Sequence, residues 1–280
     1  MASIPNLRLR DGEVVPLLGM GTWHMGERPG NRAAEIAALR LGLDLGMSLI
    51  DSAEMYGDGG AESVVGEAIH GWRESVFVVT KFYPHHASRR KLIAACDGSL
   101  AQLGGETIDL YLLHWRGTVP LEETVATLEE LVRIGKIQRW GVSNFDVADM
   151  EELVAVPGGE RCAANQVLYN LAHRGIEFDL LPWCVERRIP IMAYSPLDEG
   201  RLARHPALVM VASRLGVDPG QVALAWLLRN PGVITIPKAT TTQHVRANRA
   251  AADILLDKEA VELLEQAFPA PRRKRPLDMI

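Results

Sequence analysis

Short apolar runs alternate along most of the chain with longer segments whose apolar residues recur at helical spacing. A short apolar run bounded by polar residues is typical of a buried strand, and apolar positions three or four residues apart are typical of an amphipathic helix. The pattern predicts strands over 17–21, 49–51, 76–81, 108–114, 137–142, 163–167, 190–195 and 233–238. It predicts helices over 31–46, 60–70, 89–103, 121–132, 146–155, 178–188, 203–215, 219–229, 241–250 and 257–267.

This alternation favours one fold class. Strands that are apolar throughout are typical of parallel sheets that are covered on both faces. Eight strand–helix units within 280 residues predict an α/β fold of the closed (β/α)8 TIM barrel type rather than an open doubly wound sheet. The dinucleotide fingerprint of open sheets, G-x-G-x-x-G, is incomplete after the first strand, because position 24 is histidine. We therefore expect residues 1–280 to form a single barrel domain.

Both ends of the chain depart from the alternation. Residues 7–16 alternate apolar and polar side chains around Asp11-Gly12, which is a strong hairpin signal. We expect residues 1–16 to form an N-terminal β-hairpin before the barrel. Residues 269–280 form a C-terminal tail that carries the basic run Arg272–Arg275 between prolines. We expect this tail to be solvated or frayed rather than to form a binding patch.

Composition excludes some classes of protein. The chain has 30 lysine and arginine residues against 35 aspartate and glutamate residues, and this net charge of −5 argues against a general nucleic-acid binder. The three cysteines lack metal-ligand spacing and cannot all pair, which favours buried thiols in a reducing compartment. The N-terminus shows no signal-peptide pattern, and no apolar stretch is long enough to span a membrane. We expect a cytoplasmic protein without membrane contacts.

The candidate chemistry lies where the predicted strands end, because barrel enzymes carry their active sites at the C-terminal ends of the strands. Taken singly, each polar residue there has a structural explanation as a packing, capping or solvated residue. The combination is more specific, because four proton-transferring groups converge from the second, third and fourth strands. These four residues are Asp51, Tyr56, Lys81 and His114.

These four side chains suit the reduction of a carbonyl group. A tyrosine has an ordinary pKa of about 10, and the cation of Lys81 would lower the pKa of Tyr56 towards working pH. Asp51 would keep Lys81 charged and oriented, and a neutral His114 would donate a hydrogen bond to the carbonyl oxygen. Tyr56 would then protonate that oxygen while a hydride reaches the carbon, and a nicotinamide would have to supply the hydride.

Hydrolytic alternatives fit the sequence less well. A metal-dependent barrel hydrolase would place two histidines near the first strand, where the chain has only His24, and the adjacent His85 and His86 have no clear partners. We expect no metal. A serine hydrolase would need an activated serine near His114, and no G-x-S-x-G motif is present.

Several motifs at the strand ends match a known family in order. They are GMGTW (19–23), DSAEMYG (51–57), TK (80–81), LLHW (112–115), GVSNF (141–145), NQ (165–166), AYSPL (193–197) and IPK (236–238). Over essentially its whole length the chain resembles the aldo-keto reductase superfamily, especially compact bacterial members of the 2,5-diketo-gluconate and methylglyoxal reductase type. The resemblance implies a barrel closed at the bottom by the hairpin. It also implies NADPH lying extended across the rim, a small-molecule carbonyl substrate that is reduced to an alcohol, and a monomer.

The resemblance also implies roles for individual residues. Tyr56 would be the proton donor and Lys81 would lower its pKa, while Asp51 would pair with Lys81 and His114 would orient the carbonyl. The implied cofactor-binding residues are Gly21, Thr22, Trp23, Asp51, Ser143, Asn144, Gln166, Tyr194, Ser195, Leu197, Ile236, Lys238, Thr240, Thr241, His244 and Asn248. Among them, Ser143, Asn144 and Gln166 would hold the nicotinamide carboxamide, and Tyr194 would stack under the ring. The implied substrate pocket consists of Trp23, His24, Tyr56, Phe82, Tyr83, His114, Trp115 and Arg116.

Two departures from the family pattern change the expectation. His244 stands where many relatives have an arginine over the 2′-phosphate, and a histidine is only partly charged at neutral pH. We therefore expect the preference for NADPH to be weaker and pH-dependent, with NADH as a poorer cofactor. The segment after Phe268 is short, so we expect an open pocket in which Arg116 would suit an acidic or polyhydroxylated substrate. The alternative function is a redox-sensing regulatory subunit that binds NADPH with little turnover.

Overall fold

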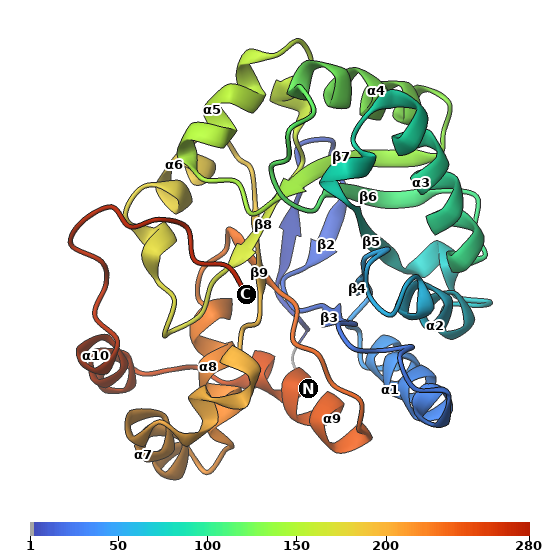
Figure 1. The fold of residues 1–280 in the computed structure, drawn as a ribbon. Coiled ribbons are helices and arrows are strands. Elements are labelled where there is room, and N and C mark those ends of the chain that lie inside the picture. The colour runs from blue at the N-terminus through green and yellow to red at the C-terminus, as the bar shows by residue number, and fades with distance from the viewer. Residues whose placement is uncertain (1–2) are drawn as a thin grey trace.

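The computed structural model describes residues 3–280, so the first two residues of the predicted hairpin lie outside the described part. The parallel sheet contains β3 (Met20–Gly21), β4 (Leu49–Asp51), β5 (Phe77–Phe82), β6 (Ile108–Leu113), β7 (Ile137–Ser143), β8 (Asn165–Leu168), β9 (Ile191–Tyr194) and β10 (Val233–Thr235). Parallel bridges from Leu18 to Thr235 and from Gly21 to Lys238 join the first and last of these strands. The predicted (β/α)8 barrel is therefore confirmed (Figure 1).

Helices surround this ring of strands (Figure 1). They are α1 (Arg32–Asp44), α2 (Gly60–Ala68), α3 (Arg89–Leu103), α4 (Leu121–Arg133), α5 (Val147–Ala155), α6 (Leu180–Glu186), α7 (Pro206–Leu215), α8 (Pro219–Leu228), α9 (Thr242–Ala250) and α10 (Lys258–Ala267). Each predicted helix is present within a few residues of its expected bounds. The largest difference is α7, which begins at Pro206 because residues 202–204 form a separate 3-10 turn. Proline is well suited to a first helical position, because its missing N–H has no partner there.

Two apolar layers follow from the alternation of side chains along the strands. On β5, Phe77 and Val79 belong to a cluster inside the barrel, whereas Val78 and Phe82 belong to the layer between the sheet and the helices. The inner cluster also contains Leu49, Leu110, Leu112, Met192 and Ile234 from other strands. The inward position that follows Val79 is Lys81, so the same alternation that builds the core also directs a charged side chain into the barrel.

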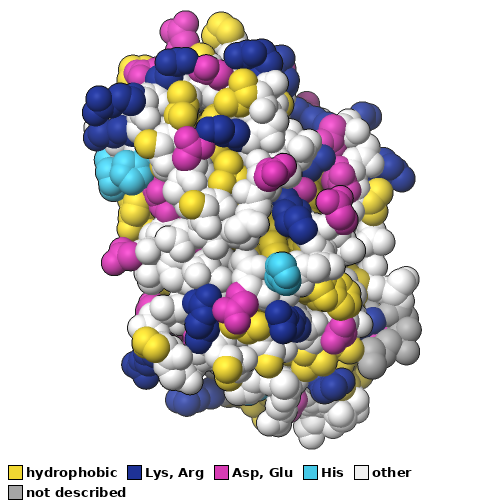
Figure 2. Space-filling model, turned by 90° about the vertical axis from the view of Figure 1, so that its right-hand side faces the viewer, with side chains coloured by type: hydrophobic (Ala, Val, Ile, Leu, Met, Phe, Trp, Pro, Cys, Tyr) yellow, Lys and Arg dark blue, Asp and Glu magenta, His cyan; other side chains and the backbone are white. Residues whose placement is uncertain are grey.

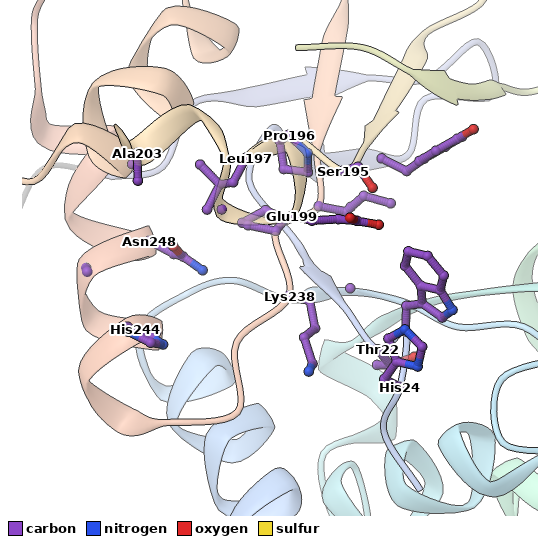
Figure 3. Close-up of a pocket in the computed structure, with 18 of the residues that line it drawn as sticks. Thr22, His24, Ser195, Pro196, Leu197, Glu199, Ala203, Lys238, His244 and Asn248 are labelled. Carbon is purple, nitrogen blue, oxygen red and sulfur yellow. The ribbon is translucent and has the colours of Figure 1, made fainter. Parts of the chain in front are cut away.

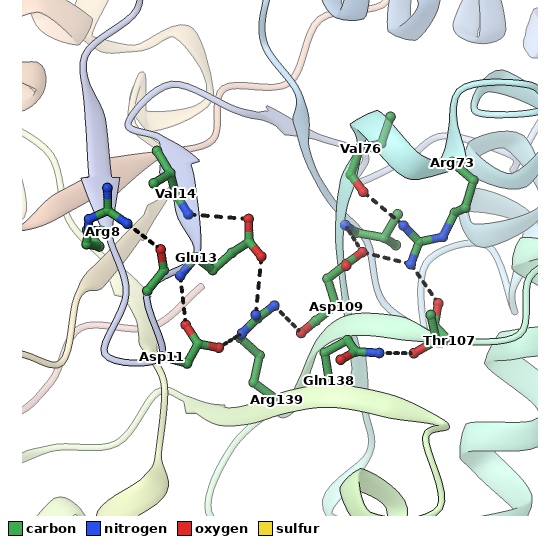
Figure 4. A network of polar contacts seen from close by, with 12 residues as sticks. Arg8, Asp11, Glu13, Val14, Arg73, Val76, Thr107, Asp109, Gln138 and Arg139 are labelled. Atoms are coloured by element: carbon green, nitrogen blue, oxygen red, sulfur yellow. Dashed lines mark hydrogen bonds and ion pairs between the residues drawn. The ribbon is translucent and has the colours of Figure 1, made fainter.

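The predicted hairpin is present as β1 (Asn6–Arg8) paired antiparallel with β2 (Val14–Pro16). Leu9, Val15 and Leu17 belong to the inner cluster, so the hairpin covers one end of the barrel core. Arg139 of β7 ties the hairpin to the barrel through Asp11 at 2.7 Å and Glu13 at 3.5 Å (Figure 4). The opposite end of the barrel, where the strands end, remains available for a site.

The outer helix faces are polar. Figure 2 shows acidic and basic side chains interleaved on the face that it presents, with hydrophobic side chains between them. No helix of residues 3–280 is long and apolar enough to cross a membrane. The three cysteines are buried and unpaired, which confirms the prediction of buried thiols, and burial raises the pKa of each to about 12.

The C-terminal tail behaves only partly as expected. From α10 it swings outwards and then returns over the ring of strands, where the chain ends (Figure 1). Lys274 pairs with Asp179 at 3.3 Å, and Asp278 pairs with His173 at 3.0 Å. Burial raises the pKa of the Tyr194 hydroxyl overall, although the backbone of Ile280 lies close enough to that group to lower its pKa in part. The tail is solvated, as predicted, because residues 272–276 and 278–280 are exposed. It is not frayed over residues 274–280, because the contacts of Lys274, Leu277 and Asp278 hold this segment against the barrel.

Candidate active site

Asp51, Tyr56 and Lys81 meet inside the mouth of the barrel, as the strand-end pattern predicts. The Lys81 side chain is fully buried, and its Nζ donates to Asp51 Oδ2 at 2.8 Å and to the Ser52 carbonyl at 2.6 Å. The same Nζ lies 3.3 Å from the Tyr56 hydroxyl and 4.9 Å from the centroid of its ring. A buried ammonium group thus has an anion on one side and a phenol on the other.

Strand register explains how these groups come together. Asp51 ends β4 and lies opposite Val79 of β5, so Lys81 is the next inward-pointing residue above it. The loop after Asp51 is fixed to β5, because the Glu54 N–H donates to the Lys81 carbonyl at 3.0 Å. A turn closed from the Tyr56 N–H to the Ala53 carbonyl at 3.0 Å then presents the phenol to Lys81.

The charges of these groups follow from their burial and from one another. Burial acts to lower the pKa of Lys81, but Asp51 and Tyr56 raise it above its ordinary value, so the ammonium group stays charged. Burial raises the pKa of Tyr56, Lys81 opposes this rise and Asp51 adds to it. The expectation that Lys81 brings this pKa down is therefore wrong for the net value. Tyr56 keeps its proton at neutral pH, as a proton donor must.

His114 follows β6 and is only 9% exposed. Burial, with a contribution from the Lys81 cation, lowers the pKa of His114 to about 3, so its ring is neutral at physiological pH, as predicted. Its ring centroid lies 6.0 Å from that of Tyr56. Within the described residues its Nδ1 is buried without a hydrogen-bond partner.

The residues predicted to hold the carboxamide form a network behind the mouth. Gln166 donates one N–H of its amide from Nε2 to Asp51 Oδ1 at 2.7 Å, and Ser143 donates to the Gln166 backbone carbonyl at 2.8 Å. Asn144, held at φ 59°, donates to the His114 carbonyl at 3.1 Å and accepts from the Tyr194 hydroxyl at 3.0 Å. Through Gln166 and Asn144 the network therefore holds two of the catalytic candidates, Asp51 and His114, in position.

An elongated cavity of about 870 Å³ runs from Tyr56 to α9. Figure 3 shows His24 and Thr22 at one end and Asn248 and His244 on α9 at the other, with Lys238 between them. The predicted cofactor residues in its wall are Gly21, Thr22, Trp23, Asp51, Tyr194, Ser195, Leu197, Ile236, Lys238, His244 and Asn248. The predicted residues Ser143, Asn144, Gln166, Thr240 and Thr241 lie outside the wall. Thr241 instead caps α9 by accepting from the His244 N–H at 3.2 Å.

Sequence reasoning missed part of the cavity wall. The additional wall residues are Pro196, Glu199, Gly200, Ala203, Asp218, Pro219, Gly220, Gln221, Pro237, Gln243 and Ala247. Several of them start α8, where Asp218 and Gln221 form a capping box. That signal was visible in the sequence, because a capping residue followed by proline predicts a helix start. Two helix N-termini therefore open onto the cavity beside Lys238, and this combination favours an anionic group.

Only some of the residues predicted to form the substrate pocket line the cavity. Trp23 and His24 line the cavity and stack with ring centroids 4.5 Å apart. The assignment of Phe82 to the substrate pocket is wrong, because its ring is fully buried on the outer side of β5. There it packs on Tyr111, with 4.9 Å between the ring centroids. Its neighbour Lys81 points inwards, so Phe82 has to point outwards.

Other predicted pocket residues lie around the third and fourth strand ends. Tyr83 stacks on His85 with ring centroids 4.8 Å apart and meets Trp115 edge-on at 6.0 Å. Arg116 binds Glu152 at 2.8 and 3.2 Å and also donates to the Val119 carbonyl at 3.1 Å. Because its guanidinium is already paired, this contact argues against the expectation that Arg116 favours an acidic substrate, which stays a prediction to be tested.

Comparisons with known proteins agree with this geometry. Residues 17–268 match the model of the Aldo/keto reductase family. The chain is 51% identical over 271 residues to methylglyoxal reductase YeaE of Escherichia coli, covering 95% of each protein. It is 29% identical to methylglyoxal reductase DkgB of Salmonella typhi, covering 88% of this chain and 90% of that protein. The crystal structure of an aldo/keto reductase from Klebsiella pneumoniae in complex with NADP and acetate is 50% identical, with a TM-score of 0.97, covering 99% and 100% of the two chains.

Proposed function

Because the chain belongs to the aldo/keto reductase family, we propose that it uses NADPH to reduce the carbonyl groups of small aldehydes and ketones to alcohols. Methylglyoxal is the first substrate to test, because the relative from Escherichia coli carries that name. The observation that carries the proposal is the contact of Tyr56 with the buried, charged Lys81 at the end of a long cavity.

The cavity suits an extended dinucleotide. Lys238, His244 and the start of α9 would hold the phosphate of the adenosine half, and Asn248 would lie beside the adenine. Ser195 and Leu197 would run along the pyrophosphate, and Tyr194 would lie under the nicotinamide. When bound, NADPH supplies the hydride that no side chain can provide. With His244 in place of an arginine, we propose that NADH is accepted as a poorer cofactor.

Side chains of this protein would orient the substrate carbonyl and transfer a proton to its oxygen. The neutral ring of His114 donates a hydrogen bond to the substrate oxygen and thereby orients the carbonyl towards Tyr56. Tyr56 transfers its hydroxyl proton to that oxygen, and the charged Lys81 stabilises the phenolate that remains. Asp51 holds the ammonium group in place and does not act on the substrate itself.

Oxidation of NADPH in the presence of methylglyoxal, followed by its absorbance, tests this function. We expect turnover with the wild type and a loss of at least about 100-fold in kcat for Tyr56→Phe, the usual scale of acid–base catalysis. The matched control is Tyr111→Phe, since Tyr111 packs in the layer between the sheet and the helices and does not line the cavity. Wild-type turnover in Tyr56→Phe would refute the assigned proton donor. NADPH binding without turnover by the wild type would favour the regulatory alternative.

A further inference from the structure

The turn after β8, residues 170–174, contacts two segments that flank the barrel mouth. The first is the cavity loop, residues 195–199, which lines the proposed dinucleotide site. The second is the C-terminal tail. We call residues 170–174 the β8 turn. It is stiff, because buried Asn170 accepts through Oδ1 from the backbone N–H groups of Ala172 and His173 at 2.9 and 3.0 Å.

The β8 turn holds the cavity loop at two points. Asn170 donates from Nδ2 to the Ser195 carbonyl at 2.8 Å, and His173 Nε2 lies 3.6 Å from Asp198 Oδ1. Ser195, Asp198 and Glu199 have φ values of 47°, 49° and 51°. Left-handed conformations of this kind are strained for residues other than glycine and persist only where surrounding contacts impose them. Arg201 holds Asp198 at 2.7 and 2.9 Å, and the β8 turn adds the Asn170 hydrogen bond and the longer His173 contact to the restraints on this strained loop.

The same turn holds the tail at both of its ends. Arg174, which is 8% exposed, donates to the Phe268 carbonyl and pairs with Glu265 at 2.6 Å where the tail leaves α10. His173 Nδ1 lies 3.0 Å from Asp278 Oδ2, two residues before the chain ends. Between these points, residues 274–278 line a small pocket together with Leu168, Ile176 and Leu180.

His173 is therefore the one side chain described here that pairs both with the cavity loop and with the end of the tail. One ring nitrogen faces Asp198 and the other faces Asp278, so a movement of either carboxylate changes the contact with the other. The tail in turn reaches the site, because the backbone of Ile280 lies beside the Tyr194 hydroxyl and Tyr194 lines the cavity.

We propose that His173 is a positioning residue that couples the cavity loop to the C-terminal tail, so that occupation of the dinucleotide site fixes residues 278–280 at the barrel mouth. The coupling rests on the proposed function, because the dinucleotide is the ligand that would order the cavity loop.

Limited digestion with trypsin measures the docking of the tail without using catalysis. Trypsin cleaves after Arg272, Arg273 and Lys274, and intact-mass spectrometry identifies the cleaved bond in the full-length protein. We expect NADP+ to slow cleavage of the wild type by at least about fivefold, the lower end of usual coupling between two sites. Asp278 is half exposed, so Asp278→Asn should fold, and we expect it to reduce the protection by NADP+ to less than about twofold.

A matched control separates coupling from simple loosening of the tail. Asp179→Asn removes the partner of Lys274 but leaves His173, Asp198 and Asp278 in place, and asparagine can still cap α6. We expect faster cleavage in this variant with the protection factor unchanged. In assays of turnover, Asp278→Asn should raise the KM for methylglyoxal more than it lowers kcat.

The outcomes are distinct when NADP+ binding is measured by titration in the same samples. Equal protection of the wild type and Asp278→Asn would overturn the coupling, as would binding of NADP+ without any change in cleavage. Loss of the protection factor in Asp179→Asn as well would also overturn it, because loosening alone would then explain the effect. Absence of NADP+ binding by the wild type would overturn the proposed function and the coupling with it.

Discussion

Replacement of Lys81 by methionine should strongly destabilise the fold as well as abolish activity. Lys81 is fully buried and its partner Asp51 is 4% exposed, with 2.8 Å between the paired atoms. Methionine fills much of the same volume but leaves the Asp51 carboxylate with only the Gln166 amide as a side-chain partner. Removal of one member of a buried ion pair costs about 3–5 kcal/mol, because a buried charge is left uncompensated.

A double-mutant cycle tests whether this cost comes from the stranded charge. The double variant Asp51→Asn/Lys81→Met leaves neither charge, so it should regain most of the loss, with an interaction energy of about 2–3 kcal/mol. The free energy of unfolding of each variant is measured in urea by circular dichroism. Arg32→Met is the control, because its pair with Glu67 is exposed and should contribute about 1 kcal/mol or less. A loss below about 1 kcal/mol in Lys81→Met, the value for an exposed pair, would refute the reasoning.

Three further predictions concern turnover. Because the pKa of His114 is about 3 and that of Tyr56 is raised, kcat/KM for the carbonyl substrate at saturating NADPH should stay level from about pH 5 to 9 and fall only as Tyr56 loses its proton; a titration near the ordinary histidine pKa of about 6.5 under these conditions would contradict a neutral His114. His244→Arg should raise the ratio of kcat/KM for NADPH to that for NADH, because His244 lines the cavity and arginine is always charged; an unchanged ratio would remove the role of His244. Arg116→Ala should change kcat/KM for a carboxylate-bearing carbonyl by less than about tenfold, or 1.4 kcal/mol, because Glu152 already neutralises the guanidinium; a larger loss would show that Arg116 binds the substrate.

The strand-end pattern was sufficient to predict the catalytic candidates. Asp51, Lys81 and His114 each stand at or just after the end of an apolar strand, and each follows an inward-pointing apolar residue by two positions. Side chains alternate with a period of two, so the barrel brings these three positions to one face of the closed sheet. The helices were predictable for a similar reason, because their apolar spacing and capping residues are local.

The same pattern was insufficient where a side chain finds its partner far along the chain. Gln166 is 115 residues from Asp51, and its amide is bound there. Arg116 is paired with Glu152, which lies 36 residues further on in α5. Neither contact has a local signature, so the residue type alone suggested a free ligand-binding group in both positions.

The sequence by itself determined the barrel, the hairpin and the three groups around Tyr56, because local periodicity and strand order are enough to specify them. Only the tertiary structure decided the net direction of the Tyr56 pKa, because burial outweighs the nearby Lys81 cation. It also decided the path of the tail, in which Asp278 meets His173 across 105 residues of sequence. A polar, proline-rich terminus has no periodicity that predicts docking, and its position depends on ion pairs that exist only once the barrel has formed.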